Sequence, residues 1–182
     1  MGLNAQPSGE RVHIGFFGLR NAGKSSVVNR VTGQTLSIVS DVKGTTTDPV
    51  QKAMELLPIG PVVIIDTPGI DDEGTLGEER VRRALRVLEK TDIAVLVTDS
   101  TRGLQPAEQE LIELFRKREI PFVIAHNKAD LTSVPAAMPE NEIYVSAAAD
   151  SNIRELKELI TTTSTPTEPE KRLVADLLAP ND

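Results

Sequence analysis

Short apolar segments alternate with longer amphipathic segments along this chain from residue 12 onward. Continuous apolar runs are typical of strands that are buried on both faces, and they fall at 12–17, 62–65, 93–97 and 122–125. Segments with helical periodicity fall at 24–31, 78–90, 107–118 and 153–160. This alternation predicts an α/β fold, in which a doubly wound, mostly parallel sheet of six strands is covered by helices on both faces.

Two of the expected strands are joined by a tight connection. The segment 50–57 leads through Pro-Ile-Gly-Pro at 58–61 into the apolar strand 62–65. A link this short permits a hairpin, so we expect one antiparallel edge strand. The last strand is expected at 142–146.

Two of the expected helices show an apolar face from which their buried side can be predicted. These positions are Val81, Leu85 and Leu88 in 78–90, and Leu111, Leu114 and Phe115 in 107–118.

The alternating pattern stops after Ile160, where Thr, Pro and acidic residues follow as far as residue 170. This composition is typical of a linker. We therefore predict one domain over 1–164 and, over 165–182, a linker and the start of a downstream domain. The apolar residues that return between Leu173 and Leu178 are equally compatible with a C-terminal helix docked on the same domain.

Composition narrows the possible functions. The 182 residues are 39% hydrophobic and 26% charged, which is typical of one globular domain. The net charge of −7 disfavours direct binding of nucleic acid or anionic lipid by this domain. The sequence has no cysteine, which excludes an iron–sulfur cluster held by this chain. It also lacks an apolar stretch of the ~20 residues that span a membrane, so we expect a cytoplasmic protein.

The first motif with clear chemistry is Gly18-Leu-Arg-Asn-Ala-Gly23-Lys24-Ser25, between a predicted strand and a predicted helix. Glycines let the backbone N–H groups point inward toward phosphates, and the start of a helix adds positive potential. Lys24 is expected to neutralise the β- and γ-phosphate oxygens and Ser25 to ligate Mg²⁺. The expected nucleotide contacts in this segment are Asn21, Ala22, Gly23, Lys24, Ser25 and Ser26.

The second motif is Asp66-Thr-Pro-Gly69, which follows a buried strand. A carboxylate at the end of that strand is suited to anchor the same Mg²⁺, and the Gly69 N–H can contact a γ-phosphate. Between the two motifs, the polar segment 40–48 contains Thr46, which we expect to contact Mg²⁺ from a loop that closes over the phosphates. A run of threonines is also compatible with an ordinary exposed loop.

The third motif is Asn127-Lys128-Ala-Asp130, after the strand at 122–125. One carboxylate can accept both the N1–H and the 2-amino group of guanine, whereas adenine offers neither, so Asp130 indicates GTP rather than ATP. The stem of Lys128 is expected to cover the ring, and Asn127 to tie this loop to the phosphate loop. Ser146 and Ala147 are expected to offer a backbone N–H to guanine O6.

Together these motifs resemble the translation-factor-like P-loop GTPases over roughly residues 12–146. The segment Asn21–Ser26 with Gly44-Thr45-Thr46-x-Asp48 is similar to the tRNA-modification and ribosome-assembly branch. Over the whole chain, with the terminal segment 172–180, the sequence most resembles the GTPase domain of the iron–iron hydrogenase maturation GTPase family. This last resemblance implies that the nucleotide state regulates assembly or transfer of the hydrogenase cluster.

The same resemblance implies hydrolysis assisted by K⁺, a cation held by the side chains of Asn21 and Thr45 and the carbonyls of Ser40 and Val42. Slow conversion of GTP to GDP and phosphate is expected. Ile70 follows Gly69 and cannot orient a water molecule. Glu78, Glu73 and Asp72 are candidates for that role, although acidic residues at such positions are also typical of a solvated loop and helix start.

By resemblance, the partners are the hydrogenase and the radical-SAM maturation proteins, and the intact protein is expected to be a dimer although this domain alone is a monomer. Neither a membrane nor nucleic acid is expected to bind this domain. Two alternatives remain open. One is a tRNA-modification or ribosome-assembly GTPase with RNA contacts in another domain, and the other is a GTP-dependent interaction module whose hydrolysis is incidental.

Overall fold

A sheet of six strands, ordered β2-β3-β1-β4-β5-β6, runs through the middle of the molecule. The computed structural model describes residues 11–33, 50–66 and 77–164. The strands are β1 (Val12–Gly18), β2 (Val50–Leu56), β3 (Gly60–Asp66), β4 (Ile93–Asp99), β5 (Phe122–Asn127) and β6 (Glu142–Tyr144). Only the β2–β3 pair is antiparallel among the described strands, so both the mostly parallel sheet and the antiparallel edge strand are confirmed.

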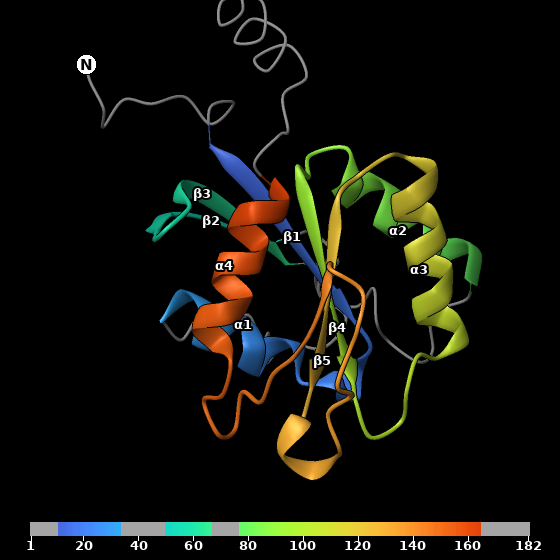
Figure 1. Ribbon diagram of the computed structural model, residues 1–182. Coiled ribbons are helices and arrows are strands. Elements are labelled where there is room, and N and C mark those ends of the chain that lie inside the picture. The colour runs from blue at the N-terminus through green and yellow to red at the C-terminus, as the bar shows by residue number, and fades with distance from the viewer. Residues whose placement is uncertain (1–10, 34–49, 67–76, 165–182) are drawn as a thin grey trace, which may run out of the picture.

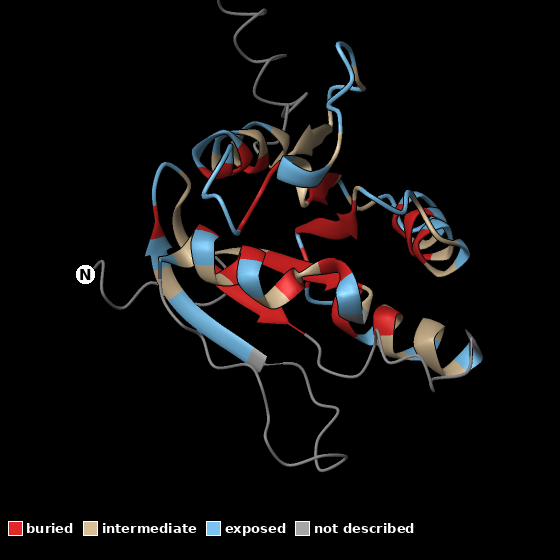
Figure 2. Ribbon diagram, turned by 90° about the horizontal axis from the view of Figure 1, so that it is seen from below, coloured by how far each residue is buried: buried red, intermediate tan, exposed pale blue. Residues whose placement is uncertain are grey.

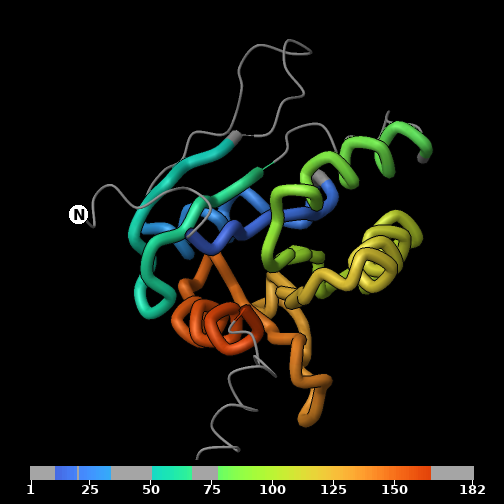
Figure 3. The backbone as a smooth tube through the Cα atoms, turned by 90° about the horizontal axis from the view of Figure 1, so that it is seen from above, coloured from blue at the N-terminus to red at the C-terminus, as the bar shows by residue number. Residues whose placement is uncertain are grey.

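Helices cover the two faces of this sheet in separate pairs (Figure 1). On one face lie α1 (Lys24–Thr32) and α4 (Ile153–Ser164), and on the other lie α2 (Gly77–Leu88) and α3 (Pro106–Lys117). Short 3-10 turns occur at η3 (Arg20–Ala22) and η4 (Ala129–Leu131). Seen from above, the β2–β3 hairpin (teal) lies at one edge of the molecule (Figure 3).

Two apolar cores result, one on each face, because successive side chains of a strand point to opposite faces. In β1, Ile14 and Phe16 belong to the core under α1 and α4, and Phe17 belongs to the core under α2 and α3. Every residue of β4 is buried, which places this strand at the centre of both cores. The buried residues gather on the strands and on the helix faces that are turned toward them (Figure 2).

The buried faces of α2 and α3 differ slightly from those predicted. In α2 the buried residues are Ala84, Val87 and Leu88, whereas Val81 and Leu85 are only half-buried. The predicted spacing found the correct side of the helix, but the face that meets the sheet is centred nearer to Ala84.

Leu111 and Phe115 are buried in α3 as predicted. Ile112 is buried as well, and Leu114 is half-buried against the same core.

Helix α4 continues to Ser164, past the composition change at Ile160. The hydroxyls of Thr161 and Thr162 donate to the carbonyls of Lys157 and Glu158, at 2.8 and 3.0 Å. In these bonds the threonine hydroxyls pair with carbonyls one turn earlier in the same helix. The linker composition therefore begins inside a helix, and the predicted segment 165–182 lies outside the described residues.

None of the helices among the described residues is long and apolar enough to span a membrane.

The aromatic packing of α3 gives a test of this fold. Phe115 is 0% exposed, and its ring lies 5.1 Å from that of Phe17 and 5.5 Å from that of Phe122. We expect Phe115→Ala to lower the free energy of unfolding by about 3–5 kcal/mol, because it leaves a cavity in the core. Urea denaturation measures this loss. Leu57→Ala is the control: Leu57 is 76% exposed in the hairpin and its loss should change stability by less than about 0.5 kcal/mol.

Candidate functional site

The carboxyl ends of the parallel strands bring the predicted motifs together. Strand β1 ends at Gly18, β3 at Asp66, β4 at Asp99 and β5 at Asn127, and all four meet at the same edge of the sheet because these strands are parallel. In an open α/β sheet this edge is where ligands bind. The site is therefore built by strand ends that lie far apart in the sequence.

The loop between β1 and α1 has the tight geometry expected of a phosphate-binding loop. Gly23 adopts a left-handed conformation, with φ +87°, directly before α1 begins at Lys24. A Cβ atom at Gly23 would collide with Asn127 Nδ2, and one at Gly18 would lie 2.6 Å from the Val97 carbonyl oxygen. Both glycines are therefore required for close contact with neighbouring strands, and the first turn of α1 carries no acidic residue that would repel an anion.

Lys24 and Asp66 form a buried ion pair at the base of this loop. Lys24 Nζ lies 2.9 Å from Asp66 Oδ1, and the two side chains are 6% and 3% exposed. Apart from this ion pair, Asp66 Oδ1 has no hydrogen-bond donor among the described residues. Such a carboxylate oxygen is the type of ligand that Mg²⁺ prefers, so Asp66 fits the predicted metal position. Ser25, the other predicted ligand, directly follows Lys24 in the first turn of α1. The described residues contain no group of three or more His, Asp or Glu that could hold a metal by itself.

Asn127 joins the phosphate loop to the loop that follows β6. Its Nδ2 donates to the Ala22 carbonyl at 2.9 Å, and its Oδ1 accepts from the Ala147 N–H at 3.1 Å. The side chain is buried, with the residue 4% exposed. The predicted tie between Asn127 and the phosphate loop is thus present, and the amide has a second partner that the sequence did not indicate.

Lys128 is held between the phosphate loop and the end of β4. Its Nζ donates to the Asn21 carbonyl at 2.9 Å and to Asp99 Oδ2 at 3.1 Å. Burial raises the pKa of Asp99, but the hydrogen bonds from Thr101 and Lys128 outweigh it, and the pKa lies below the usual value for aspartate. Asp99 is therefore an anion near neutral pH, and it holds the Lys128 ammonium group at the end of β4.

Asp130 and Ser146 lie together at the far end of the site. Ser146 Oγ donates to Asp130 Oδ1 at 2.8 Å and accepts from the Ala149 N–H at 3.0 Å. The Ser146 N–H donates to the Ser151 carbonyl. The Ala147 N–H donates to Asn127 Oδ1. A guanine O6 that accepted from the Ala147 N–H would therefore share this donor with Asn127.

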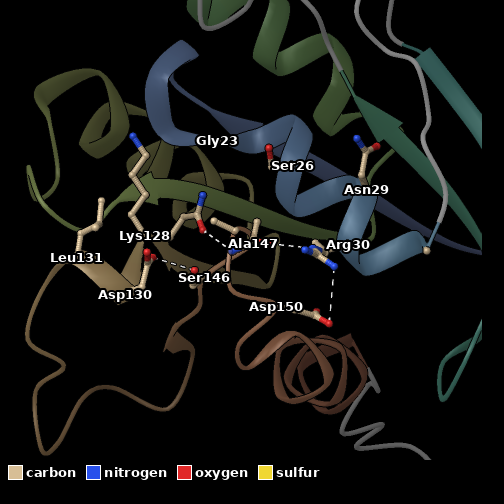
Figure 4. A pocket seen from close by; sticks show the side chains of 13 residues that line it. Gly23, Ser26, Asn29, Arg30, Lys128, Asp130, Leu131, Ser146, Ala147 and Asp150 are labelled. Atoms are coloured by element: carbon tan, nitrogen blue, oxygen red, sulfur yellow. Dashed lines mark hydrogen bonds and ion pairs between the residues drawn. The ribbon is translucent and has the colours of Figure 1, made fainter.

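A cavity of about 830 Å³, within the size range of small-molecule sites, extends from Gly23 and Ser26 to Asp130 and Ser146. Lys24 and Asp66 lie outside its lining. Figure 4 shows Lys128, Asp130 and Ser146 on one side of it and α1 with Ser26 and Arg30 on the other. The arrangement can hold an anionic group at Gly23 and a planar polar ring beside Asp130.

The structure brings together most of the predicted site. The predicted residues that line the cavity are Gly23, Ser26, Asn127, Lys128, Asp130, Ser146 and Ala147. Asn21 and Ala22 bond to Lys128 and Asn127 through their carbonyls, Lys24 pairs with Asp66, and Ser25 lies in the first turn of α1. Glu78 is exposed in the first turn of α2, and its proposed role in orienting water stays a prediction. Predicted positions outside the described residues are Ser40, Val42, Thr45, Thr46, Gly69, Asp72 and Glu73.

Two contributors were not indicated by the sequence. Asp99 is the final residue of a hydrophobic strand, and Arg30 lies on an exposed part of α1. Neither stands in a recognisable motif, and only the folded geometry brings Asp99 to Lys128 and Arg30 to the loop after β6.

The sequence matches the family described as 50S ribosome-binding GTPase over residues 13–128. It is 32% identical over 153 residues to the tRNA modification GTPase MnmE of Nitrosomonas europaea. The aligned region covers 81% of this chain and 34% of that protein. It is 41% identical over 125 residues to GTPase Der of Maridesulfovibrio salexigens, covering 66% of this chain and 27% of that protein. The chain thus spans about a third of the length of these relatives.

Solved structures show the same fold. Era in complex with MgGDPNP and nucleotides 1506–1542 of 16S ribosomal RNA superposes with a TM-score of 0.66 at 27% identity, covering 87% of this chain and 58% of that chain. A single-residue variant of Era from Aquifex aeolicus, bound to GDP.AlF4⁻, superposes with a TM-score of 0.65 at 26% identity, covering 83% and 56%. These likenesses agree with the fold class predicted from the sequence.

The glycine that begins α1 offers a test of the site. We expect Gly23→Ala to weaken binding of GDP by at least ~100-fold, or about 2.7 kcal/mol, because the new Cβ displaces Asn127 and strains the loop. A fluorescent GDP analogue measures the affinity. Gly60→Ala is the matched control, since Gly60 also has a positive φ, +108°, and open space around its Cβ position, but begins β3 and is not part of the cavity lining. Equal losses in the two variants would contradict the role of Gly23.

Proposed function

Because the chain belongs to the 50S ribosome-binding GTPase family, we propose that its cavity holds GTP, with the phosphates at Gly23–Ser25 and guanine at Asp130. The domain is a GTPase that converts GTP to GDP and phosphate. The observation that supports this placement is Asn127, whose side chain bonds to Ala22 in the phosphate loop and to Ala147 in the loop after β6. The Lys24–Asp66 ion pair lies at the phosphate end, and the Ser146–Asp130 hydrogen bond lies at the base end. Because Asn127 bonds to both loops, it fixes them relative to each other, and one nucleotide can contact both.

At the phosphate end, Lys24 supplies the positive charge that the β- and γ-phosphate oxygens require. Lys24 and Asp66 are nearly desolvated, so their electrostatic interactions are stronger than those of exposed groups. Backbone N–H groups at the start of α1 add further donors. Bound Mg²⁺, held by Ser25 and Asp66, would neutralise the charge that develops on the phosphates during hydrolysis.

At the base end, Asp130 accepts two hydrogen bonds from the guanine edge while Ser146 holds one of its oxygens in place. Lys128 is anchored at its Nζ, so its apolar stem provides a surface for one face of the ring. An adenine ring would leave the Asp130 carboxylate unpaired, and an unpaired polar group of this kind costs affinity. Guanine selectivity follows from that unpaired group.

For the intact protein, we propose a role in tRNA modification or ribosome assembly. Relatives named tRNA modification GTPase MnmE and GTPase Der favour this alternative over the hydrogenase role. Regulation of hydrogenase cluster assembly, with the hydrogenase and radical-SAM proteins as partners, rests on the resemblance of the whole sequence and stays a prediction. A tRNA-modifying or KH domain encoded after residue 182 would decide for the first role, and a cysteine-containing cluster domain for the second.

Base recognition is tested by changing Asp130. We expect Asp130→Asn to weaken GTP binding by at least ~50-fold, or about 2.3 kcal/mol, and to improve binding of xanthosine triphosphate, because the amide can pair with the 2-oxo group of xanthine. Competition against a fluorescent nucleotide measures both affinities. Asp92→Asn, at the opposite end of the sheet, is the control and should change neither. Unchanged GTP affinity in Asp130→Asn would overturn the placement of the base.

The proposed K⁺ requirement is tested by steady-state turnover in matched KCl and NaCl. We expect GTP hydrolysis to be roughly tenfold faster in KCl, which corresponds to about 1.4 kcal/mol of transition-state stabilisation. Asn21→Ala should remove this difference, because the resemblance assigns the Asn21 side chain to the cation. Its carbonyl bond to Lys128 is a backbone contact and should persist. Equal rates in the two salts would exclude the K⁺ proposal without affecting GTP binding.

A further inference from the structure

Arg30 connects the helix that begins at the phosphate loop to the loop that faces the base. It lies in α1, six positions after Lys24, on the side that faces the loop 146–151 (Figure 4). Arg30 Nε donates to the Ala147 carbonyl at 2.8 Å. The guanidinium also pairs with Asp150, with Nη1 lying 3.7 Å from Asp150 Oδ2.

The loop that receives this contact is closed on itself. Ser146 and Ser151 exchange two backbone hydrogen bonds, of 3.0 and 2.9 Å, and Asp150 and Asn152 have positive φ values of 55° and 62°. The two hydrogen bonds close the loop at its ends, and contacts from other elements hold it against the rest of the site. On the inner side, Asn127 and Asp130 hold it through the Ala147 N–H and Ser146 Oγ.

Arg30 supplies the contact that reaches this unit from α1. The Ala147 carbonyl has one other donor among the described residues, the Asp150 N–H at 3.4 Å, and Ala147 is 4% exposed. A short hydrogen bond from a charged donor is stronger than that longer neutral one. The ion pair with Asp150 contributes little by comparison, since its side chains are 44% and 61% exposed.

We propose that Arg30 is a positioning residue for guanine binding: its Nε holds the Ala147 carbonyl so that the loop 146–151 keeps Ser146 and Ala147 at the base edge of the cavity. This proposal rests on the GTP-binding function proposed above. Arg30 acts on the nucleotide through Ala147, because its hydrogen bond fixes the position of the loop 146–151 relative to α1. Nucleotide affinity depends on this hydrogen bond, whereas GTP hydrolysis depends on Lys24 at the other end of α1.

Three variants separate the hydrogen bond from the charge and from helix surface effects. Arg30→Ala removes the donor. Arg30→Gln replaces Nε with an amide nitrogen the same number of bonds from Cα, so it keeps a neutral donor to Ala147 and loses the charge opposite Asp150. Arg154→Ala is the matched control, because Arg154 is an exposed arginine on α4 that makes no hydrogen bond or ion pair among the described residues.

For Arg30→Ala we expect the KM for GTP and the dissociation rate of GDP to rise about tenfold, with kcat within about twofold of the unaltered domain. Arg30→Gln should recover affinity to within about threefold of the unaltered domain, and Arg154→Ala should match that domain. An unchanged KM in Arg30→Ala would overturn the proposal. So would a fall in kcat as large as the rise in KM, because it would place the effect on the phosphate loop.

Hydrogen exchange of the nucleotide-free protein gives a readout that does not depend on GTP. We expect faster exchange at the amides of Ala147 and Ser151 in Arg30→Ala than in Arg30→Gln, with unchanged exchange in β4. Equal exchange in both variants would overturn the positioning role. If the unaltered domain itself failed to bind GTP, the proposed function would fall, and this exchange comparison would still decide whether Arg30 holds the loop.

Discussion

The side-chain amide of Asn127 is the interaction on which the site depends. One buried group donates to the phosphate loop at Ala22 and accepts from the base-facing loop at Ala147, and so joins segments more than a hundred positions apart. Gly23 lacks a side chain because the amide occupies that space. Lys128, one residue later, adds a second connection, from Asn21 in the phosphate loop to Asp99 at the end of β4. The two ends of the nucleotide site are therefore fixed relative to each other by polar contacts of adjacent residues.

Local sequence patterns predicted the elements and the motifs because both depend on nearest neighbours along the chain. The apolar runs identified the strands, and the glycines and Lys24 identified the phosphate loop. The detailed burial of α2 was less predictable, since Ala84 is buried through its contact with the sheet rather than through its own hydrophobicity. Helix α4 also continues into residues of linker composition, where the Thr161 hydroxyl donates to the Lys157 carbonyl within the helix.

The contributions of Arg30 and Asp99 could not be predicted for a different reason. Each acts through a contact across the fold, Arg30 with a backbone carbonyl and Asp99 with a lysine ammonium group. Every residue has a backbone carbonyl, so the identity of Ala147 does not indicate that its carbonyl accepts from a charged donor. The residues that hold a binding loop in place are in this respect harder to find from sequence than those that touch the ligand.

The buried pair of Lys24 and Asp66 has a consequence for which anions can enter the site. Asp66 is a built-in counter-ion, so an incoming ligand competes with a carboxylate that is already in contact with the lysine. A singly charged anion would only replace the Asp66 carboxylate as the partner of the Lys24 ammonium group. A polyphosphate that brings a divalent cation offers an anionic partner to Lys24 and a cationic partner to Asp66. The counter-ion that the chain carries at Asp66 therefore favours ligands that bring a cation of their own over small anions.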